Sequence, residues 1–462
     1  MQTPSHSGVA IRISQPTGVW GVVLFASITL GIAALFMPLI YVVALLVGLV
    51  IIALVFWQPA VGGGIYICLV YSRLLEYLPQ LQDYRILMLL SGLLGASLFV
   101  HNLLSGDRWW FGGVQLKILF IALAVCASIP LSIWKSNSVN ASIDFLKIIT
   151  SVLLIANSIK SERQLLWFTR LLVLSFMWLS WTVVWNYFAG NVGYEGGGEV
   201  IRAHGAGSTL GDSNEVMSYV LMLAPLALLG VRFEPVILLK VVYGLSIPAS
   251  LAALVFSGSR GGFLGFLWLL FIFLIRSKHK VVYVIVGCLV FVTVWFSAPS
   301  TWRDRMLSIK DYKQDESAVI RTQLWQAARG MVKHNPVTGI GVGNFSEFAQ
   351  NYGAGVGMVA HNTYYLFAGE LGLLGLTAYV LYLLHIWRTG KRWAVSAEQN
   401  IVRQWLGEGL WLGYLVFLVP SYFVALSYYT HTYVPAAVLA AGERFYRAKR
   451  ELTGDIHRVR TY

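Results

Sequence analysis

Long apolar segments joined by short polar connectors make up most of the chain. A helix needs about 20 predominantly apolar residues to cross the hydrocarbon core of a bilayer. The runs are continuous and lack the alternation of barrel strands, so they predict an all-α polytopic membrane protein with about 12–14 spans. Segments 38–57, 143–158 and 428–443 also fit tilted or re-entrant helices. The expected spans are 17–36, 38–57, 59–78, 85–103, 115–134, 143–158, 164–190, 213–231, 236–257, 260–276, 280–298, 361–386, 406–425 and 428–443.

One long polar stretch, residues 299–360, interrupts this pattern. It separates N-terminal spans over 1–298 from C-terminal spans over 361–443, which a basic tail over 444–462 follows. A chain built mostly for lipid that keeps one large extramembrane loop is expected to place chemistry there.

The polar loop carries helical patterns of its own. Residues 301–309 predict a short interfacial helix. Residues 317–332 predict an amphipathic helix, which His334-Asn335-Pro336 ends. The run Gly339-Ile340-Gly341-Val342-Gly343 lacks the strand and helix of a dinucleotide fingerprint, so it predicts a turn whose backbone approaches another element closely. The apolar stripe of the amphipathic helix consists of Ile320, Leu324, Ala328 and Met331.

Composition and charge agree with a membrane protein. Hydrophobic residues make up 57% and charged residues 12% of the chain, and the mean hydropathy is +0.68, whereas a soluble domain carries roughly 25% charged residues. The net charge of +13 is compatible with nucleic-acid binding. However, when the spans cross the membrane alternately, 21 Lys and Arg residues lie on one side and four on the other. The charge therefore reflects topology, and no nucleic-acid partner is expected. The four are Arg85, Lys135, Arg202 and Arg260.

The same asymmetry fixes the expected orientation. Basic residues concentrate on the cytoplasmic side, so both termini are expected there and residues 299–360 on the outer face. The polar N-terminus and the apolar segment from Val19 show no small-residue cleavage site, which predicts an uncleaved signal anchor.

Neither a disulfide framework nor a metal site is indicated. Cys68, Cys126 and Cys288 all lie in apolar runs and are expected to be small buried hydrophobes. The sequence contains no HExxH, DxD or P-loop pattern, so no metal and no other cofactor is expected.

Two shorter segments join the polar loop on the expected outer face: the glycine-rich, mobile stretch 190–207 and the turn 257–262. Arg260 lies in this tight turn between two apolar spans, where a cation needs an anionic partner. Arginine suits phosphate because its planar fork donates bidentate hydrogen bonds, and the flanking glycines leave backbone N–H groups open to an anion. The alternatives are a lipid-headgroup anchor and a pair with a carboxylate.

Arg202, in the glycine-rich stretch, is a second phosphate candidate. Arg321, which shares a helix face with Trp325, is a third, with a surface ion pair as the alternative. Asp212 precedes a span and either pairs with Arg202 or supports the site. Arg73 and Glu76, three apart in one expected span, form an intrahelical pair most simply.

His361, at the exit of the polar loop, titrates near neutral pH and is a candidate base, acid or hydrogen-bond donor, with a structural role as the alternative. Glu370 lies nine residues further on inside an apolar span and needs a partner there. Nine residues place it on the opposite helix face, so structural pairing is expected rather than contact with His361.

Taken in order, these candidate residues and the fragments around them, which are given at the end of this paragraph, resemble the O-antigen ligase / Wzy polymerase superfamily of bacterial inner-membrane enzymes. Each fragment is weak alone, but together they span about residues 200–376 on one membrane face; they do not separate the members of the superfamily. Family ligases are usually described with twelve spans, fewer than the upper count here. The fragments are Arg202-Ala203-His204-Gly205, Gly211-Asp212-Ser213-Asn214-Glu215, Ser259-Arg260-Gly261-Gly262, Arg321 and Trp325, Pro336 to Phe345, His361-Asn362-Thr363-Tyr364, and Glu370 to Gly375.

The resemblance implies an O-antigen ligase with a GT-C-type fold at the periplasmic face of the inner membrane. Its donor would be an undecaprenyl-diphosphate-linked glycan and its acceptor a sugar of the lipid A-core, without metal or nucleotide sugar. Arg202 and Arg260 would neutralise the donor diphosphate, with Arg321 as a third contact. His361 would activate or orient the acceptor hydroxyl, with Asp212 and Asn362 as supporting residues.

The chemistry agrees with these roles. Fixed guanidinium groups stabilise the negative charge that develops on the leaving diphosphate, so a metal ion becomes dispensable. A base on the opposite side of the anomeric carbon gives inversion by single displacement. The amphipathic helix is expected to cover the site and to clamp lipid or glycan.

Other functions are alternative hypotheses for the same residues. A Wzy-type polymerase and a protein O-oligosaccharyltransferase share this chemistry and differ in acceptor. A membrane transporter or flippase is a different class. Transporters tend to show internal repeats and substrate groups near the midplane, whereas the candidate groups here cluster at one face, which favours an enzyme.

Overall fold

The computed structural model describes residues 39–77, 84–195, 200–205, 210–311, 316–355, 357–396 and 400–459. The chain divides into two compact units, Met1–Trp57 and Gln58–Tyr462. In the first unit, the structure describes α2 (Leu39–Trp57), an apolar helix of 19 residues. The expected span 17–36 lies outside the described residues.

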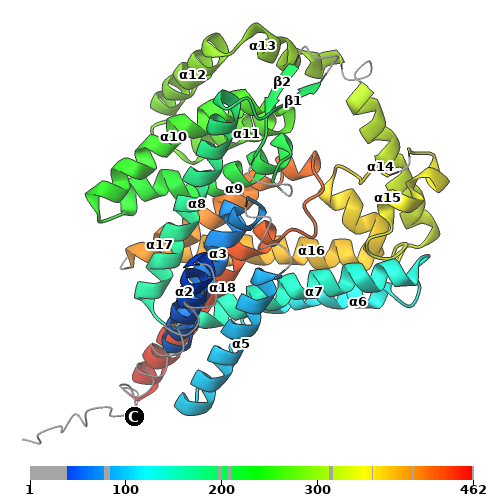
Figure 1. Ribbon diagram of the computed structural model, residues 1–462. Coiled ribbons are helices and arrows are strands. Elements are labelled where there is room, and N and C mark those ends of the chain that lie inside the picture. The colour runs from blue at the N-terminus through cyan, green and yellow to red at the C-terminus, as the bar shows by residue number, and fades with distance from the viewer. Residues whose placement is uncertain are drawn as a thin grey trace, which may run out of the picture. The chain divides into compact units, whose positions relative to one another are not determined.

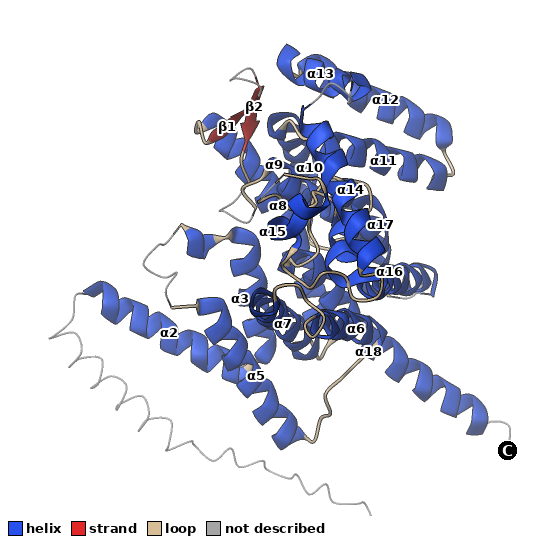
Figure 2. Cartoon of the chain, turned by 90° about the vertical axis from the view of Figure 1, so that its right-hand side faces the viewer, coloured by secondary structure: helices blue, strands red, loops and turns tan. Residues whose placement is uncertain are grey.

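The second unit is almost entirely helical (Figures 1 and 2). Its first half contains α3 (Pro59–Ser72), η1 (Leu74–Glu76), α5 (Ile86–Ser105), α6 (Gly113–Ser128), α7 (Lys135–Ser158), α8 (Glu162–Phe188), β1 (Val192–Glu195), β2 (Val200–Ala203), α9 (Ser213–Phe233), α10 (Ile237–Ser257), α11 (Arg260–Arg276) and α12 (Lys280–Ser297). Its second half contains α13 (Ser300–Leu307), η2 (Ser308–Asp311), α14 (Glu316–His334), α15 (Phe345–Phe348), η3 (Ala349–Tyr352), α16 (Thr363–Ser396), α17 (Ile401–Phe417), η4 (Pro420–Tyr422) and α18 (Thr430–Val459).

Seven helices of the described residues are long and apolar enough to cross a membrane: α5, α7, α8, α9, α10, α12 and α16 as far as Val395. The predicted all-α polytopic membrane fold is confirmed. Length and apolarity alone do not reach the expected 12–14 spans, because α3, α6, α11 and α17 have only 14, 16, 17 and 17 residues. The expected span 59–78 ends at Ser72, where Arg73 turns into the left-handed region with φ 53°.

The centre of the second unit is formed by α9, α16 and α17. α9 packs against α8, α10, α11 and α17, while α16 packs against α6, α14 and α17. The largest side chains at this centre are fully buried and mostly aromatic, and the Tyr382 hydroxyl donates to the Thr432 carbonyl at 3.0 Å. A dense aromatic core of this kind fixes the ends of the helices on which the site depends.

A buried ion pair joins α8 to the end of α9. Arg170 donates from Nε and Nη2 to both oxygens of Glu234, at 2.9 and 2.6 Å. The guanidinium and carboxylate planes therefore meet in the bidentate geometry that makes such pairs strong.

The polar loop folds as the sequence predicts. The expected helices at 301–309 and 317–332 correspond to α13 with η2 and to α14. The predicted stripe of α14 is buried in a cluster with Ile340, Phe345, Ala360 and Leu366, and Ile320 packs against its edge. The loop is therefore held to the N-terminal end of α16.

Two expectations are corrected. The glycine-rich stretch 190–207 contains an antiparallel hairpin, in which Gly193 pairs with Arg202, so residues 192–195 and 200–203 are strands rather than a mobile loop. The expected burial of the cysteines is wrong for Cys68 and Cys288, which are exposed, and Cys126 is half-buried.

Candidate functional site

The turn between α10 and α11 consists of two residues. Gly258 ends α10 in the left-handed region with φ 58°, a conformation that glycine adopts without steric cost. Ser259 caps α11, and its hydroxyl accepts a hydrogen bond from the Gly262 amide at 3.0 Å. The turn fixes Arg260 as the first residue of α11.

Three arginines from three different elements meet at this turn. Arg202 on β2 donates from Nε to the Ser257 carbonyl at 3.1 Å. Arg305 on α13 donates from Nε to the Gly258 carbonyl at 2.9 Å, and Arg260 follows the turn directly. Like charges gathered on one surface raise the local concentration of anions. The arrangement is therefore suited to a multiply charged anion such as a diphosphate.

The sequence singles out Arg202 and Arg260 but not Arg305. Arg305 lies in a short polar helix, and nothing in its local pattern distinguishes it from a surface cation. It reaches the turn because α13 packs against both α11 and β2. Only the tertiary fold brings it to the site.

The first turn of α9 borders the arginine cluster. The Ser259 hydroxyl donates to the Asn214 side-chain oxygen at 2.8 Å. Two residues earlier, the carboxylate of Asp212 caps α9 by accepting from the amides of Asn214 and Glu215 at 2.7 and 3.2 Å. Negative charge is favourable at the start of a helix, so α9 holds Asp212 in a fixed position beside the cluster.

Asp212 also acts electrostatically on His361. Burial and the nearby Arg321 guanidinium lower the pKa of His361, whereas Asp212 acts to raise it, and the net shift is downward. The neutral imidazole, which is the form that accepts a proton, therefore dominates at neutral pH. His361 also adopts a left-handed backbone conformation, with φ 44°, and such strain clusters at functional sites.

Neighbouring hydrogen bonds hold His361 in this conformation. Trp325 on α14 donates to the Ala360 carbonyl at 3.1 Å. Asn362 is fully buried, and its side-chain oxygen accepts from the amides of Tyr364 and Tyr365, both at 2.9 Å. Asn362 therefore caps α16, and the residue before the cap is the histidine. Arg321 and Trp325, predicted to share a face, both act on this segment.

The glycine run after α14 has a structural role, as predicted. Gly339, Gly341 and Gly343 have positive φ values of 65°, 98° and 81°. α16 is broken at Gly372, and the loop pairs with the broken helix: Gly341 donates to the Glu370 carbonyl at 2.9 Å. Backbone hydrogen bonds thus hold the glycine run against α16.

Glu370 pairs with this loop rather than with an arginine. Its carboxylate accepts from the Phe345 amide at 3.0 Å, in a fully buried setting. The expected structural pairing is confirmed, and its partner is a backbone amide that sequence reasoning did not foresee.

A second polar group lies beyond Asp212. Tyr429, just before α18, donates to the Glu215 carboxylate at 3.1 Å. Arg73 forms an ion pair with Glu76, as predicted, although a helix end separates the two residues. Burial lowers the pKa of Arg73, while Tyr429 and Glu215 act to raise it, so these groups share one environment. Sequence reasoning missed this group because its members come from three distant segments.

Metal chemistry has no evident ligand set in the described part of the chain, where no three His, Cys, Asp or Glu residues gather. What does gather is three guanidinium groups at a helix turn, with the first turn of α9 beside them.

Comparison with known proteins gives one finding. Residues 245–380 match the family model described as O-antigen ligase, whereas the comparison with curated proteins found no match. The matched region includes the α10–α11 turn, Arg305, α14 and His361; Arg202 and Asp212 lie upstream of it. This family consists of glycosyltransferase-like ligases and polymerases. Through this region, which is less than half of the chain, the protein is similar to the O-antigen ligase / Wzy polymerase superfamily.

Proposed function

We propose that the protein is an O-antigen ligase, an inverting glycosyltransferase that moves a glycan from undecaprenyl diphosphate to a sugar of the lipid A-core. The observation that carries this proposal is the convergence of Arg202, Arg260 and Arg305 on one helix turn, next to the α9 turn whose Asp212 acts on the pKa of His361. The reaction would take place at the periplasmic face of a bacterial inner membrane, with residues 299–360 as a periplasmic loop and both termini in the cytoplasm.

In this proposal the arginines bind the donor diphosphate. When the bond between the anomeric carbon and the diphosphate breaks, negative charge accumulates on the leaving group. Guanidinium groups that are already in place stabilise this charge more in the transition state than in the bound donor. The carbonyls of Ser257 and Gly258 hold Arg202 and Arg305 before the donor arrives.

His361 acts as the general base. Its neutral imidazole takes the proton of the acceptor hydroxyl, whose oxygen forms the new bond at the anomeric carbon on the face opposite the leaving diphosphate. The result is inversion. Arg321 and Asp212 set the proton affinity of His361 from opposite directions, and Asn362 supports it by capping α16.

The test uses purified protein, lipid-diphosphate glycan and separately offered acceptors in EDTA. Transfer to lipid A-core supports the proposal. Transfer only to a second lipid-linked glycan assigns a polymerase, transfer only to a serine or threonine side chain assigns a protein O-oligosaccharyltransferase, and movement of lipid without transfer assigns a transporter.

Two substitutions test the roles of the residues. His361→Ala is expected to abolish transfer while donor binding persists, and near-normal turnover removes His361 from the mechanism. Arg260→Gln is expected to weaken donor binding, most strongly at low salt, where the charge is least screened. An unchanged donor affinity would instead favour a headgroup anchor. Phe345→Leu, a conservative change in the buried cluster under α14, serves as the control for general loss of stability.

A further inference from the structure

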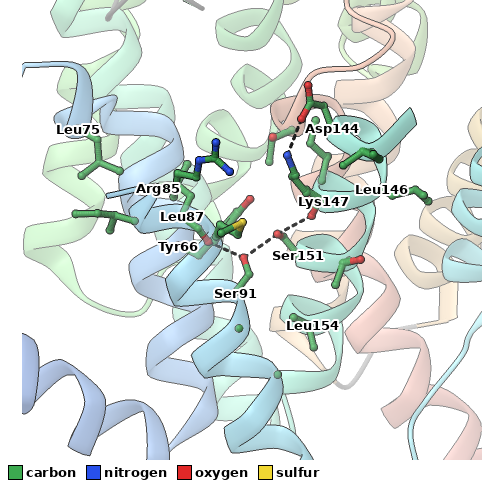
Figure 3. A pocket seen from close by; sticks show the side chains of 18 of the residues that line it. Tyr66, Leu75, Arg85, Leu87, Ser91, Asp144, Leu146, Lys147, Ser151 and Leu154 are labelled. Atoms are coloured by element: carbon green, nitrogen blue, oxygen red, sulfur yellow. Dashed lines mark hydrogen bonds and ion pairs between the residues drawn. The ribbon is translucent and has the colours of Figure 1, made fainter. Parts of the chain in front are cut away.

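A large groove lies between α3, α5 and α7, apart from the arginine cluster. Its volume is about 1450 Å³, which exceeds the roughly 300–1,000 Å³ of typical small-molecule sites. Its walls are mainly apolar, with Leu87 on α5 facing Leu146 and Leu154 on α7 (Figure 3). Such a space suits the hydrocarbon chains of a lipid.

Small residues on α5 open the groove. Gly92, Gly95 and Ala96 line it, and a Cβ added at Gly92 would meet no atom within 4 Å. At the floor, the hydroxyls of Ser91 and Ser151 lie 2.9 Å apart and join α5 to α7. The helices are therefore fixed to each other while the space above them stays open.

Both carboxylates and cations line the groove, and Glu76 and Asp144 are the carboxylates. Arg85, at the start of α5, and Lys147, on α7, project from opposite walls (Figure 3). Lys147 donates to Asp144 at 2.7 Å, but 49% and 74% of their side chains are exposed. An exposed pair of this kind is worth about 0–1 kcal/mol, so Lys147 can exchange its carboxylate for an anionic headgroup at little cost.

The lining of the groove reaches the first turn of α9 through one polar group. Glu76 and Thr430 belong to its lining. Thr430 follows Tyr429, which donates to Glu215, and Glu215 lies in the same helical turn as Asp212. Asp212 acts on His361. The lining thus connects, through one polar group, to the α9 turn that borders the arginine cluster and whose Asp212 acts on His361.

We propose that this groove binds the acyl chains of the acceptor, an anionic glycolipid whose phosphates contact Arg85 and Lys147. The assignment rests on the proposed function. It separates the two lipid substrates, because the donor diphosphate lies at the α10–α11 turn and the acceptor enters between α5 and α7.

The test blocks the groove without disturbing its walls. Gly92→Phe fills the open space, and Gly287→Phe on α12 is the matched control, because its added Cβ also meets nothing within 4 Å. The binding probe is lipid A with a photoactivatable acyl chain, crosslinked to the full-length protein in detergent. Gly92→Phe is expected to reduce crosslinking and to raise the KM for acceptor at least about tenfold, with the KM for donor unchanged. Gly287→Phe is expected to change neither.

Competition identifies the occupant. Unlabelled lipid A is expected to suppress crosslinking, and undecaprenyl phosphate is not. Suppression by undecaprenyl phosphate, or a rise in the KM for donor, assigns the groove to the donor and overturns the proposal, as does crosslinking that Gly92→Phe leaves intact. Crosslinking needs no turnover, so a protein that binds lipid A here yet transfers nothing refutes the proposed function alone.

Discussion

The glycine run after α14 allows a sharp test of how the site is held. In Gly339→Ala, the new Cβ would lie 2.4 Å from the backbone carbon of Glu370, at a φ of 65°. A left-handed conformation costs an ordinary residue about 1–2 kcal/mol. The contact with α16 adds about 1–3 kcal/mol, the typical cost of overpacking, because backbone cannot move aside as a flexible side chain can.

Comparison with Gly353→Ala isolates the cost of the contact with α16. Gly353 has a φ of 88°, but its added Cβ would meet nothing within 4 Å. This control therefore carries the conformational cost without the clash. Gly339→Ala is expected to be less stable than Gly353→Ala by about 1–3 kcal/mol, and to lose transfer activity that Gly353→Ala retains.

The assay is thermal unfolding in detergent at one fixed heating rate, followed by tryptophan fluorescence, because membrane proteins often unfold irreversibly. Equal midpoints for the two variants would refute the close approach of residue 339 to α16. A lower midpoint for Gly339→Ala with full activity would show that the glycine run stabilises the fold without positioning His361.

Three further predictions follow from single contacts. Arg321→Met removes a cation that lowers the pKa of His361, so the acidic limb of kcat/KM against pH is expected to move to higher pH, whereas Asp212→Asn is expected to move it to lower pH; shifts of the same sign would contradict this electrostatic account. Trp325→Phe removes the hydrogen bond behind the histidine, a loss of about 0.5–1.5 kcal/mol, and is expected to reduce kcat with the KM for donor unchanged; a changed donor KM would place Trp325 at the donor. Arg170→Met leaves a buried carboxylate on α9 without its guanidinium, and is expected to cost about 3–5 kcal/mol in thermal unfolding; an unchanged midpoint would show that the pair contributes nothing.

The sequence predicts the local features of this protein well. Helices form where apolar runs lie, and α14 buries the stripe that its periodicity predicts. The turn at Ser257 to Gly262 and the close approach of the glycine run are also local, since one left-handed glycine or one N-cap decides each. These features depend on residues a few positions apart.

The sequence could not predict features that join distant segments. Arg305 and Tyr429 reach the site only through the packing of α13 and the start of α18. The hairpin containing Arg202 was missed because its glycines mask a short pairing pattern. The count of spans also depends on tertiary structure. Helices such as α11 have only 17 residues, which is shorter than the roughly 20 that identify a membrane span from sequence.

The α10–α11 turn shows how two guanidinium groups can be held close together in spite of their repulsion. The last carbonyls of a helix carry partial negative charge and lack partners within the helix. Those of Ser257 and Gly258 accept from Arg202 and Arg305, so the end of α10 offsets part of the repulsion between the two guanidinium groups. The start of α11, two residues later, carries partial positive charge together with Arg260. One helix end therefore holds the cations, while the next would face the diphosphate of the proposed donor. A lysine at position 202 would keep the charge but lack the planar fork that lets one side chain bond the Ser257 carbonyl and a phosphate at once.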